Sequence, residues 1–346
     1  MAGRKQHFIQ RLLLKGFSYD APRDPCHVWV YRRSGKPFPT ALDGYGAERD
    51  FYGDPDKSNL DSRITNLESD CFNDFLIGMR DGADGSVDPV QAAAFAIHVF
   101  ARSKNLRSMF TAGAEPLMAR FREYLRTEGM LERLVESGMR ENPGLFREKL
   151  GIAGVPAWKI AEIEPQITAL YPTLAKAFVT KQRHVIDAFL DQFQGQVRDL
   201  VADGHRKTLH DRLHDFSGTR SAQLGALKWQ TITVQQDLVL GDSVVFVELA
   251  DGSFKPATEP DDALSRVWLP ITAKRVLVGS SHNEEPVIHV PRINHGAAAC
   301  SFDAFCASEG PDRHASLVPA IRTATFSLDA TAIDQIAKEA ITKLLK

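Results

Sequence analysis

Cysteine is rare in this sequence of 346 residues, and none of the four cysteines stands in a Cys-x-x-Cys pair. This spacing excludes a zinc ribbon and a dithiol redox motif. No apolar run approaches the roughly 18 residues that a membrane helix needs, and Met1 is not followed by the apolar run and cleavage site of a secretory signal. These absences predict a cytoplasmic protein with reduced thiols and without a membrane partner.

Several catalytic signatures are also missing. The sequence has no Gly-x-Ser-x-Gly nucleophile elbow, and Gly44-Tyr45-Gly46 lacks the later glycine and the strand-to-helix setting of a phosphate-binding loop. Basic and aromatic residues do not alternate as they do in proteins that bind single-stranded nucleic acid. The four tryptophans are scattered, and we expect them to lie in the core: Trp29, Trp158, Trp229 and Trp268.

The net charge of −2 argues against a protein that coats DNA. The charge is uneven, however: residues 1–36 carry eight Lys or Arg against two Asp, and residues 43–85 carry eleven Asp or Glu against four Lys or Arg. Two arrangements explain this asymmetry. Either the basic segment docks on the acidic one, or an anion site lies beside a metal site. We expect docking.

Hydrophobic periodicity predicts a mixed fold. Residues 27–31 are β-branched and aromatic and predict a strand, and the Pro-, Gly- and Asp-rich residues 37–62 predict a long ordered loop. Apolar residues at helical spacing predict helices over 64–82, 88–111, 115–138, 143–150, 155–163, 166–201 and 205–216. Short apolar runs between turns predict strands over 228–234, 238–240, 244–249, 266–269, 275–278 and 286–290, before a closing helix at 330–345.

This order indicates an α+β fold. The N-terminal strand near Trp29 is expected to pair with a C-terminal, mainly antiparallel sheet, with a large helical insertion between them. We therefore expect three segments: residues 1–62 with the N-terminal motif, strand and long loop, residues 63–222 as a helical lobe, and residues 223–346 as the sheet with its closing helix. Segments 1–62 and 223–346 are expected to form one unit.

The stretch from Lys5 to Phe17 is dense in aromatic and cationic side chains. Its apolar residues fall at the spacing of one buried helical face, while His7, Arg11 and Lys15 repeat every four residues along a neighbouring stripe. One interpretation is an N-terminal helix, or strand and helix, that docks on the core with His7 at its edge. The other is an anion site in which the three basic side chains face a phosphate or a carboxylate.

The same stretch, Lys-x-His-Phe-Ile-x-x-x-x-Leu-x-x-Phe, resembles the start of a bacterial family of unknown function whose members typically begin Lys-x-His-Tyr-Ile-Pro-x-x-Tyr-Leu-x-x-Phe. The resemblance covers most of residues 5–280 and implies no established activity. Gln10 and Val244 depart from it, because the family usually has proline at both positions. Further segments resemble those of the family in the same order: Val28–Tyr31, Glu48 with Phe51 and Tyr52, Glu68, Arg102-Ser103, Leu240–Ser243 and Leu269–Thr272.

Asp242 is the most prominent candidate, in a Gly-Asp-Ser turn between two predicted strands. An aspartate in such a turn commonly caps its own backbone. Alternatively, Asp242 joins Glu48 and Glu68 as carboxylate ligands of Mg²⁺ or Mn²⁺ beside a substrate phosphate. In that arrangement the predicted catalytic residues are His7, Glu48 and Asp242, and the predicted anion-binding residues are Arg11, Lys15 and Arg102.

Histidines offer a second metal candidate. His210 and His214 share the i, i+4 spacing that suits zinc, with His205 nearby, but the residues between them lack the Glu of a metalloprotease motif. Pairing with neighbouring aspartates on a helix surface is the alternative. His98 and Arg102 have the same spacing, and we expect them at a solvated helix end rather than in an anion-facing patch.

Two functional hypotheses follow. The first is a metal-dependent phosphodiester hydrolase, nuclease-like and associated with defence or mobile elements, which acts on nucleic acid or another phosphate-bearing ligand. It requires the candidate residues to converge in one cleft. The second is a non-catalytic interaction or accessory module, in which the same residues are caps and internal salt bridges. It requires them to pair off with other groups of the protein.

Overall fold

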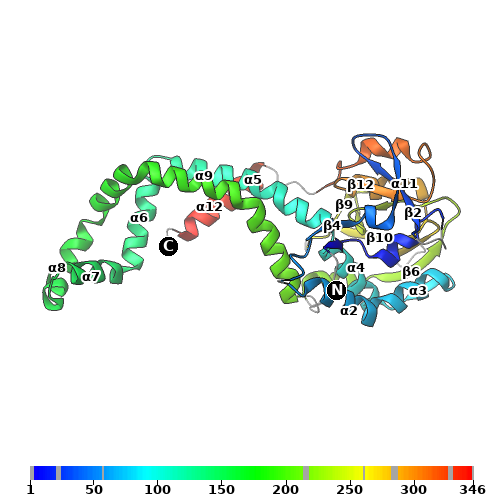
Figure 1. Cartoon of the computed structure of the whole chain (residues 1–346), viewed down its shortest axis with the longest axis horizontal. Helices are drawn as coiled ribbons and strands as arrows, with labels where there is room; N and C mark the ends of the chain where they lie inside the picture. Colours follow the sequence, from blue (N-terminus) through cyan, green and yellow to red (C-terminus); the bar gives the residue numbers. More distant parts are fainter. Residues whose placement is uncertain are drawn as a thin grey trace. The chain divides into compact units, whose positions relative to one another are not determined.

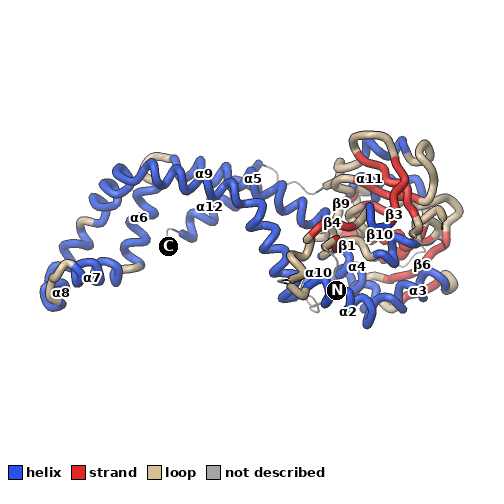
Figure 2. Tube along the Cα trace, in the orientation of Figure 1, coloured by secondary structure: helices blue, strands red, loops and turns tan. Residues whose placement is uncertain are grey.

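The computed structural model describes residues 4–20, 25–56, 58–212, 218–259, 262–281, 287–325 and 330–344. The chain divides into two compact units. Unit 1 comprises Met1–Met109 and Asp203–Phe326, and unit 2 comprises Phe110–Ala202 and Ser327–Lys346. All described strands belong to unit 1, whereas the described elements of unit 2 are helices (Figure 1, Figure 2).

A six-stranded antiparallel sheet supports unit 1. Its strands follow the order β5 (Gly85–Val87), β6 (Lys228–Thr233), β11 (Arg275–Ser280), β10 (Leu264–Thr272), β8 (Phe246–Leu249) and β9 (Phe254–Lys255). The central strand β11 is buried along its whole length. Gly279 of β11 lies opposite Trp229, and a Cβ atom at Gly279 would stand only 2.8 Å from the indole ring. The close approach of this ring therefore requires glycine.

A second, four-stranded sheet joins the two ends of the chain. Its strands follow the order β3 (Phe38–Ala41), β2 (His27–Arg32), β12 (Ala304–Ala307) and β7 (Leu240–Gly241). Strand β2 pairs antiparallel with β12, so that Trp29 lies opposite Ala307. The α+β fold predicted from the sequence is thus confirmed, with an N-terminal strand paired to a C-terminal one and a large helical region between them.

The N-terminal stretch forms a strand and a short helix. Strand β1 (Lys5–His7) pairs with β4 (Ala47–Arg49), and helix α1 (Arg11–Lys15) follows. Gly16 ends this helix, and its carbonyl accepts a 2.9 Å hydrogen bond from the N–H of Ala273. A Cβ atom at Gly16 would lie 2.5 Å from the carbonyl oxygen of Ile271, so glycine lets α1 pack against β10. The apolar residues of the stretch are buried: Phe8, Ile9, Leu13, Leu14 and Phe17.

The helices of unit 1 surround these sheets. Helix α4 begins as predicted, because Pro89 occupies its first turn and the carboxylate of Asp88 accepts a 2.7 Å hydrogen bond from the N–H of Gln91. The predicted helix at 64–82 is instead three consecutive segments, the middle one a π-helix. The helical segments are η1 (Leu42–Gly44), α2 (Leu60–Leu67), η2 (Glu68–Phe72), α3 (Asn73–Asp81), α4 (Pro89–Ala101), α10 (Thr219–Gly225), α11 (Val290–Cys300) and η3 (Ala315–Ala320).

Unit 2 is built from helices with a small core of its own. That core consists of Leu125, Leu131, Val179 and Leu190, with partly buried neighbours around it. Two long helices, α5 and α9, contribute residues to both units, and their unit 2 portions are linked by an Arg122–Asp191 ion pair. The helices are α5 (Lys104–Arg126), α6 (Met130–Glu141), α7 (Pro143–Ile152), α8 (Ala157–Ala169), α9 (Tyr171–Arg212) and α12 (Ala330–Leu344).

Several predictions from the sequence differ from the observed helices, strands and burial. The single helix predicted over 88–111 is interrupted at Arg102 and Ser103, between α4 and α5. Of the strand predicted over 286–290, Pro286 lies outside the described residues and Val290 begins α11. Trp158 is 69% exposed on α8, so it is not a core residue.

The division into units also differs from the predicted segments. The boundary expected at residues 62–63 falls inside unit 1, because α2, α3 and α4 belong with the sheets. The closing helix α12 belongs to unit 2 rather than to the C-terminal sheet. Within the described part of the chain, no helix is both long enough and apolar enough to cross a membrane.

Candidate functional site

The β1–β4 ladder places the first candidate residues side by side. Gln6 lies opposite Glu48, and His7 lies opposite Ala47. The turn that follows β1 is held by Gly46, whose carbonyl accepts hydrogen bonds from the N–H groups of Phe8 and Ile9 at 2.8 and 3.0 Å. This ladder fixes His7 and Glu48 in one region of unit 1.

Arg102 reaches this ladder from the end of α4. The guanidinium is buried, at 3% exposure, and donates a 3.0 Å hydrogen bond from Nε to the hydroxyl of Tyr52. It donates a second one, of 2.5 Å, from Nη2 to the carbonyl of His7, which also accepts from the Tyr52 hydroxyl at 3.0 Å. Nη1 forms an ion pair with Glu68 of η2. Arg102 therefore joins β1, the segment after β4, η2 and α4.

His98 completes this buried group one helical turn before Arg102. Its Nε2 lies 3.3 Å from Nη1 of Arg102 and 3.6 Å from Oε1 of Glu68, and its ring stacks on Phe72. Burial lowers the pKa of His98 to about 4, so the imidazole is neutral at pH 7. The expectation that His98 and Arg102 lie at a solvated helix end is wrong, because both side chains are buried.

Glu48 belongs to a second, more exposed group of charges. Its carboxylate pairs with Arg107 and lies 3.7 Å from Nζ of Lys104. The same Nζ stands 3.1 Å from a carboxylate oxygen of Asp303, and the Arg107 guanidinium lies 4.0 Å from the centre of the Phe51 ring. Glu48 is thus neutralised by two cations of α5.

Asp242 is held by backbone N–H groups of the two residues before β12 and of its first residue, Ala304. Its carboxylate accepts hydrogen bonds from three consecutive N–H groups, those of Phe302 and Asp303 at 2.7 Å and that of Ala304 at 3.1 Å. The side chain is 2% exposed, and burial raises the pKa of Asp242 to about 6 although the three donors oppose this. This geometry is that of a cap, formed with N–H groups about sixty residues away in sequence.

The N-terminal segment and the segment around the start of β12 meet in unit 1. The Tyr45 hydroxyl, between η1 and β4, donates a 3.1 Å hydrogen bond to the carbonyl of Ala304, whose N–H binds Asp242. Lys104 links Glu48 to Asp303 in the same region. The segments that carry Glu48 and Asp242 therefore lie near each other in unit 1, but each carboxylate faces a different internal partner.

The predicted anion-binding side chains behave differently from one another. His7 and Arg11 both face Asp43 of η1, at 3.2 Å and 3.9 Å from the same carboxylate oxygen. Burial lowers the pKa of His7, against the attraction of Asp43. Lys15 is exposed in the last turn of α1. The carboxylate that His7 and Arg11 meet is thus one of the chain's own.

The uneven charge of the sequence is explained by docking of this kind. Arg4 lies 3.7 Å from Asp50 and 3.9 Å from Asp54, and Arg11 lies near Asp43. The basic N-terminal segment thus packs against the acidic segment that follows it.

No metal site is assembled by the predicted ligands. Glu48 pairs with Arg107, Glu68 with Arg102, and Asp242 with backbone N–H groups. Among the residues that the structure describes, no group of three or more His, Cys, Asp or Glu side chains is placed to hold a metal ion.

The described α9 histidines that were considered as zinc ligands also contact groups of the protein itself. His205 is buried, and its Nε2 lies 2.9 Å from the carbonyl of Ala101. Nδ1 of His210 lies 3.3 Å from the carboxylate of Asp211, which is the helix-surface pairing considered for it. His214 lies outside the described residues.

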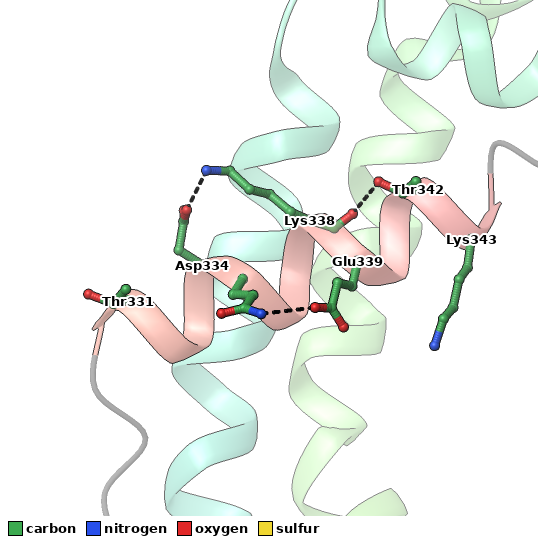
Figure 3. Close-up of a pocket in the computed structure, with 7 residues that line it drawn as sticks. Thr331, Asp334, Lys338, Glu339, Thr342 and Lys343 are labelled. Atoms are coloured by element: carbon green, nitrogen blue, oxygen red, sulfur yellow. Dashed lines mark hydrogen bonds and ion pairs between the residues drawn. The ribbon is translucent and has the colours of Figure 1, made fainter.

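A shallow hollow lies along α12 in unit 2 (Figure 3). Its side chains come from one helix and pair with one another: Lys338 donates to Asp334 at 2.6 Å, and Gln335 donates to Glu339 at 3.1 Å. Lys338, Tyr124 and Arg120 hold the pKa of Asp334 well below its usual range. None of the candidate residues from the sequence lines this hollow.

The feature that sequence reasoning missed lies in unit 2. Large apolar side chains are exposed there at several positions, and Phe189 on α9 is 62% exposed. The helical periodicity of α9 was visible in the sequence, but which of its apolar stripes lacks a partner depends on the packing of α5 and α12. The exposed set in unit 2 is Ile152, Trp158, Leu170, Phe178, Val185, Phe189, Leu200 and Ile336.

Comparisons of this chain with protein-family models, with curated proteins and with solved structures gave no match. The assignment of a function therefore rests on the geometry alone.

Proposed function

We propose that this protein is an interaction module whose docking surface lies in unit 2. The single observation that carries this proposal is the row of exposed apolar side chains on α9, where Phe178, Val185, Phe189 and Leu200 are 47–62% exposed. Exposed aromatic and aliphatic side chains that gather on one element are typical of protein–protein interaction sites. Removing exposed apolar area of this kind from water by covering it with a partner is favourable.

The internal contacts of the charged residues of unit 1 also support this proposal. Arg102, Glu68, Glu48 and Asp242 are engaged by internal hydrogen bonds and ion pairs. Buried polar groups that are satisfied in this way stabilise one conformation. In the proposed function these residues brace the β1–β4 ladder and the start of β12, and their pattern in the sequence reflects the architecture of unit 1.

The metal-dependent phosphodiester hydrolase remains a prediction with a direct assay. Purified protein is incubated with Mg²⁺ or Mn²⁺ and mixed nucleic acids, beside the Glu48→Gln and Glu68→Gln variants. The interaction module predicts the same background signal for all three proteins. Metal-dependent cleavage by the unmodified protein that both variants lose would overturn the proposal.

The docking surface itself is tested by site-specific photo-crosslinking in the cells that naturally produce the protein. A photoreactive phenylalanine analogue replaces Phe178, Val185 or Phe189 in unit 2. Matched controls carry it at exposed apolar positions of unit 1, namely Tyr19, Val90 and Val287. We expect discrete protein adducts of reproducible mass from the unit 2 positions alone. Adducts of equal yield at both sets of positions, or none at the unit 2 positions, would contradict the proposal.

A further inference from the structure

The exposed apolar stripe of α9 has a symmetric spacing. Taking Phe189 as the centre, Val185 and Phe193 lie four residues away on either side, and Phe178 and Leu200 lie eleven residues away. Two glutamines, Gln182 and Gln196, lie seven residues away on either side. At 100° per residue these seven positions fall within an arc of about 80° on the helix. We call this set the α9 stripe.

Most of the α9 stripe is exposed, with Gln182 and Phe193 half-buried, whereas the neighbouring face of the helix is buried. Phe178, Val185, Phe189 and Leu200 are 47–62% exposed. Val179 and Leu190, which lie on the adjacent face, are buried in the core of unit 2. The α9 helix therefore carries an exposed apolar face beside the apolar face that packs into the core of unit 2.

Opposite charges lie near the two ends of the α9 stripe, on the side away from the buried face. Lys181 and Asp199 lie on the same side of the stripe, because eighteen residues correspond to five full turns of a helix. Lys181 precedes the centre by eight residues and Asp199 follows it by ten. Both side chains are exposed. A stripe with opposite charges near its two ends is complementary to itself when it is turned end for end.

From this arrangement we propose that the partner is a second copy of this chain, docked antiparallel along the α9 stripe with the two Phe189 side chains at the two-fold axis. The inference rests on the proposed function and names its partner. In this pairing Phe178 of one copy meets Leu200 of the other, and Val185 meets Phe193. Lys181 of each copy lies beside Asp199 of its partner, so the ion pair forms twice.

The antiparallel direction follows from the charges and the spacing. In a two-fold parallel pair the flanking charges of the two copies would lie on opposite sides of the seam, so Lys181 would face no Asp199, whereas the antiparallel pair brings both residues to the same side. The antiparallel pair matches apolar positions with apolar ones and glutamine with glutamine. The matched segment from Phe178 to Leu200 is about 33 Å long, at about 1.5 Å per residue. An isologous interface of this kind closes on itself as a dimer.

Sedimentation velocity of the purified full chain over a concentration series tests the dimer. We expect a species of twice the chain mass of 38.3 kDa. Phe189→Glu places two carboxylates at the two-fold axis and is expected to shift the protein to monomer. Thr180→Glu, on the opposite face of α9, is the matched control and is expected to leave the dimer unchanged.

A charge exchange tests the register. Lys181→Asp and Asp199→Lys each place like charges together and are expected to weaken the dimer, with at least a several-fold rise in its dissociation constant. The double variant Lys181→Asp/Asp199→Lys restores opposite charges and is expected to recover most of the affinity. Circular dichroism confirms that each variant remains helical, as expected for exposed positions.

Thiol crosslinking tests the direction, in a Cys71→Ser background because Cys71 is exposed. A mixture of Phe178→Cys chains and Leu200→Cys chains is expected to form a crosslinked heterodimer, whereas Phe178→Cys chains alone are not. A monomeric unmodified protein, or a dimer indifferent to Phe189→Glu, would overturn the inference. Photo-crosslinks from the α9 stripe to a different protein would then leave the proposed function in place, whereas an absence of adducts would remove both.

Discussion

Asp242 lies in the turn between β7 and β8, and its carboxylate accepts hydrogen bonds from the N–H groups of residues 302–304, where β12 begins. Two effects on its pKa oppose each other. Burial disfavours the charged form, and the three donors favour it, with burial the larger effect. The carboxyl group is therefore both a structural cap and a titrating group.

The titration of Asp242 predicts a pH dependence of stability. The pKa in the folded protein is raised to about 6 from the usual value near 3.8, so the unfolded chain loses this proton first as the pH rises. Stability is then lost between about pH 4 and pH 7, by about 3 kcal/mol for a difference of about two pKa units. We expect chemical denaturation to show this loss in the unmodified protein relative to Asp242→Asn.

Both proteins contain His98, so the comparison with Asp242→Asn cancels the effect of His98 on the pH dependence of stability, which has the opposite sign. The pKa of His98 is lowered to about 4, so the unfolded state binds the proton first and stability falls as the pH drops below 6.5. A difference between the unmodified protein and Asp242→Asn that stays constant from pH 4 to pH 8 would show that Asp242 is not shifted upward.

Arg102 provides a second prediction at the residue scale. Arg102→Met leaves the Glu68 carboxylate without its buried cation, and we expect a loss of about 3–5 kcal/mol in the free energy of unfolding. Arg102→Met/Glu68→Met removes both charges, and its loss should be smaller than that of the single variant. Denaturant unfolding of the four proteins in a double-mutant cycle measures the coupling. A double variant less stable than Arg102→Met alone contradicts an internal bracing role.

The sequence could suggest the role of such residues only in part. The Gly-Asp-Ser turn predicts a capping aspartate or a metal ligand equally well, because the deciding N–H groups belong to residues 302–304. The regular spacing of His7 and Arg11 predicted a shared stripe, and both do face Asp43. They do so from a strand and a helix rather than from one helix, which only the pairing of β1 with β4 determines.

At the scale of elements, long periodic segments were easier to predict than short ones. The strands β6 and β11 follow directly from their apolar patterns, and most of α9 was predicted as helix, although as two helices (166–201 and 205–216) rather than one. The helix α11 does not, because the β-branched residues Val287, Ile288 and Val290 at and before its start favour a strand. Its position depends on packing: a Cβ atom at Gly296 would lie 2.6 Å from the Phe246 ring. Tertiary contacts thus override local preference there.

The break between α4 and α5 gives a prediction at this scale. Ser103 precedes the first residue of α5, and its hydroxyl accepts a 3.2 Å hydrogen bond from the N–H of Leu106. Ser103→Ala removes this N-cap, and we expect it to lower the free energy of unfolding by about 1 kcal/mol. Ser103→Thr keeps a hydroxyl and should lose less. Thermal and denaturant unfolding measure both, and equal losses would assign the effect to packing.

At the scale of the whole molecule, the order of strands and helices was sufficient to predict an α+β fold with its ends joined. It was not sufficient to divide the chain correctly, because α2, α3 and α4 pack with the sheets and α12 packs with unit 2. The exposed stripe of α9 is a property of this division. Only the burial of its adjacent face in the core of unit 2 shows which apolar residues of α9 lack a partner.

The most direct test of the interaction module compares two opposite faces of α9 in one measurement. The photoreactive analogue is placed at Phe189, in the α9 stripe, or at Thr180, which lies nine residues earlier and on the opposite, exposed face of α9. The crosslinked fraction of the chain is then quantified by gel electrophoresis and mass spectrometry. We expect a discrete protein adduct at Phe189 in at least several-fold excess over Thr180. Equal crosslinking of the two faces would contradict it.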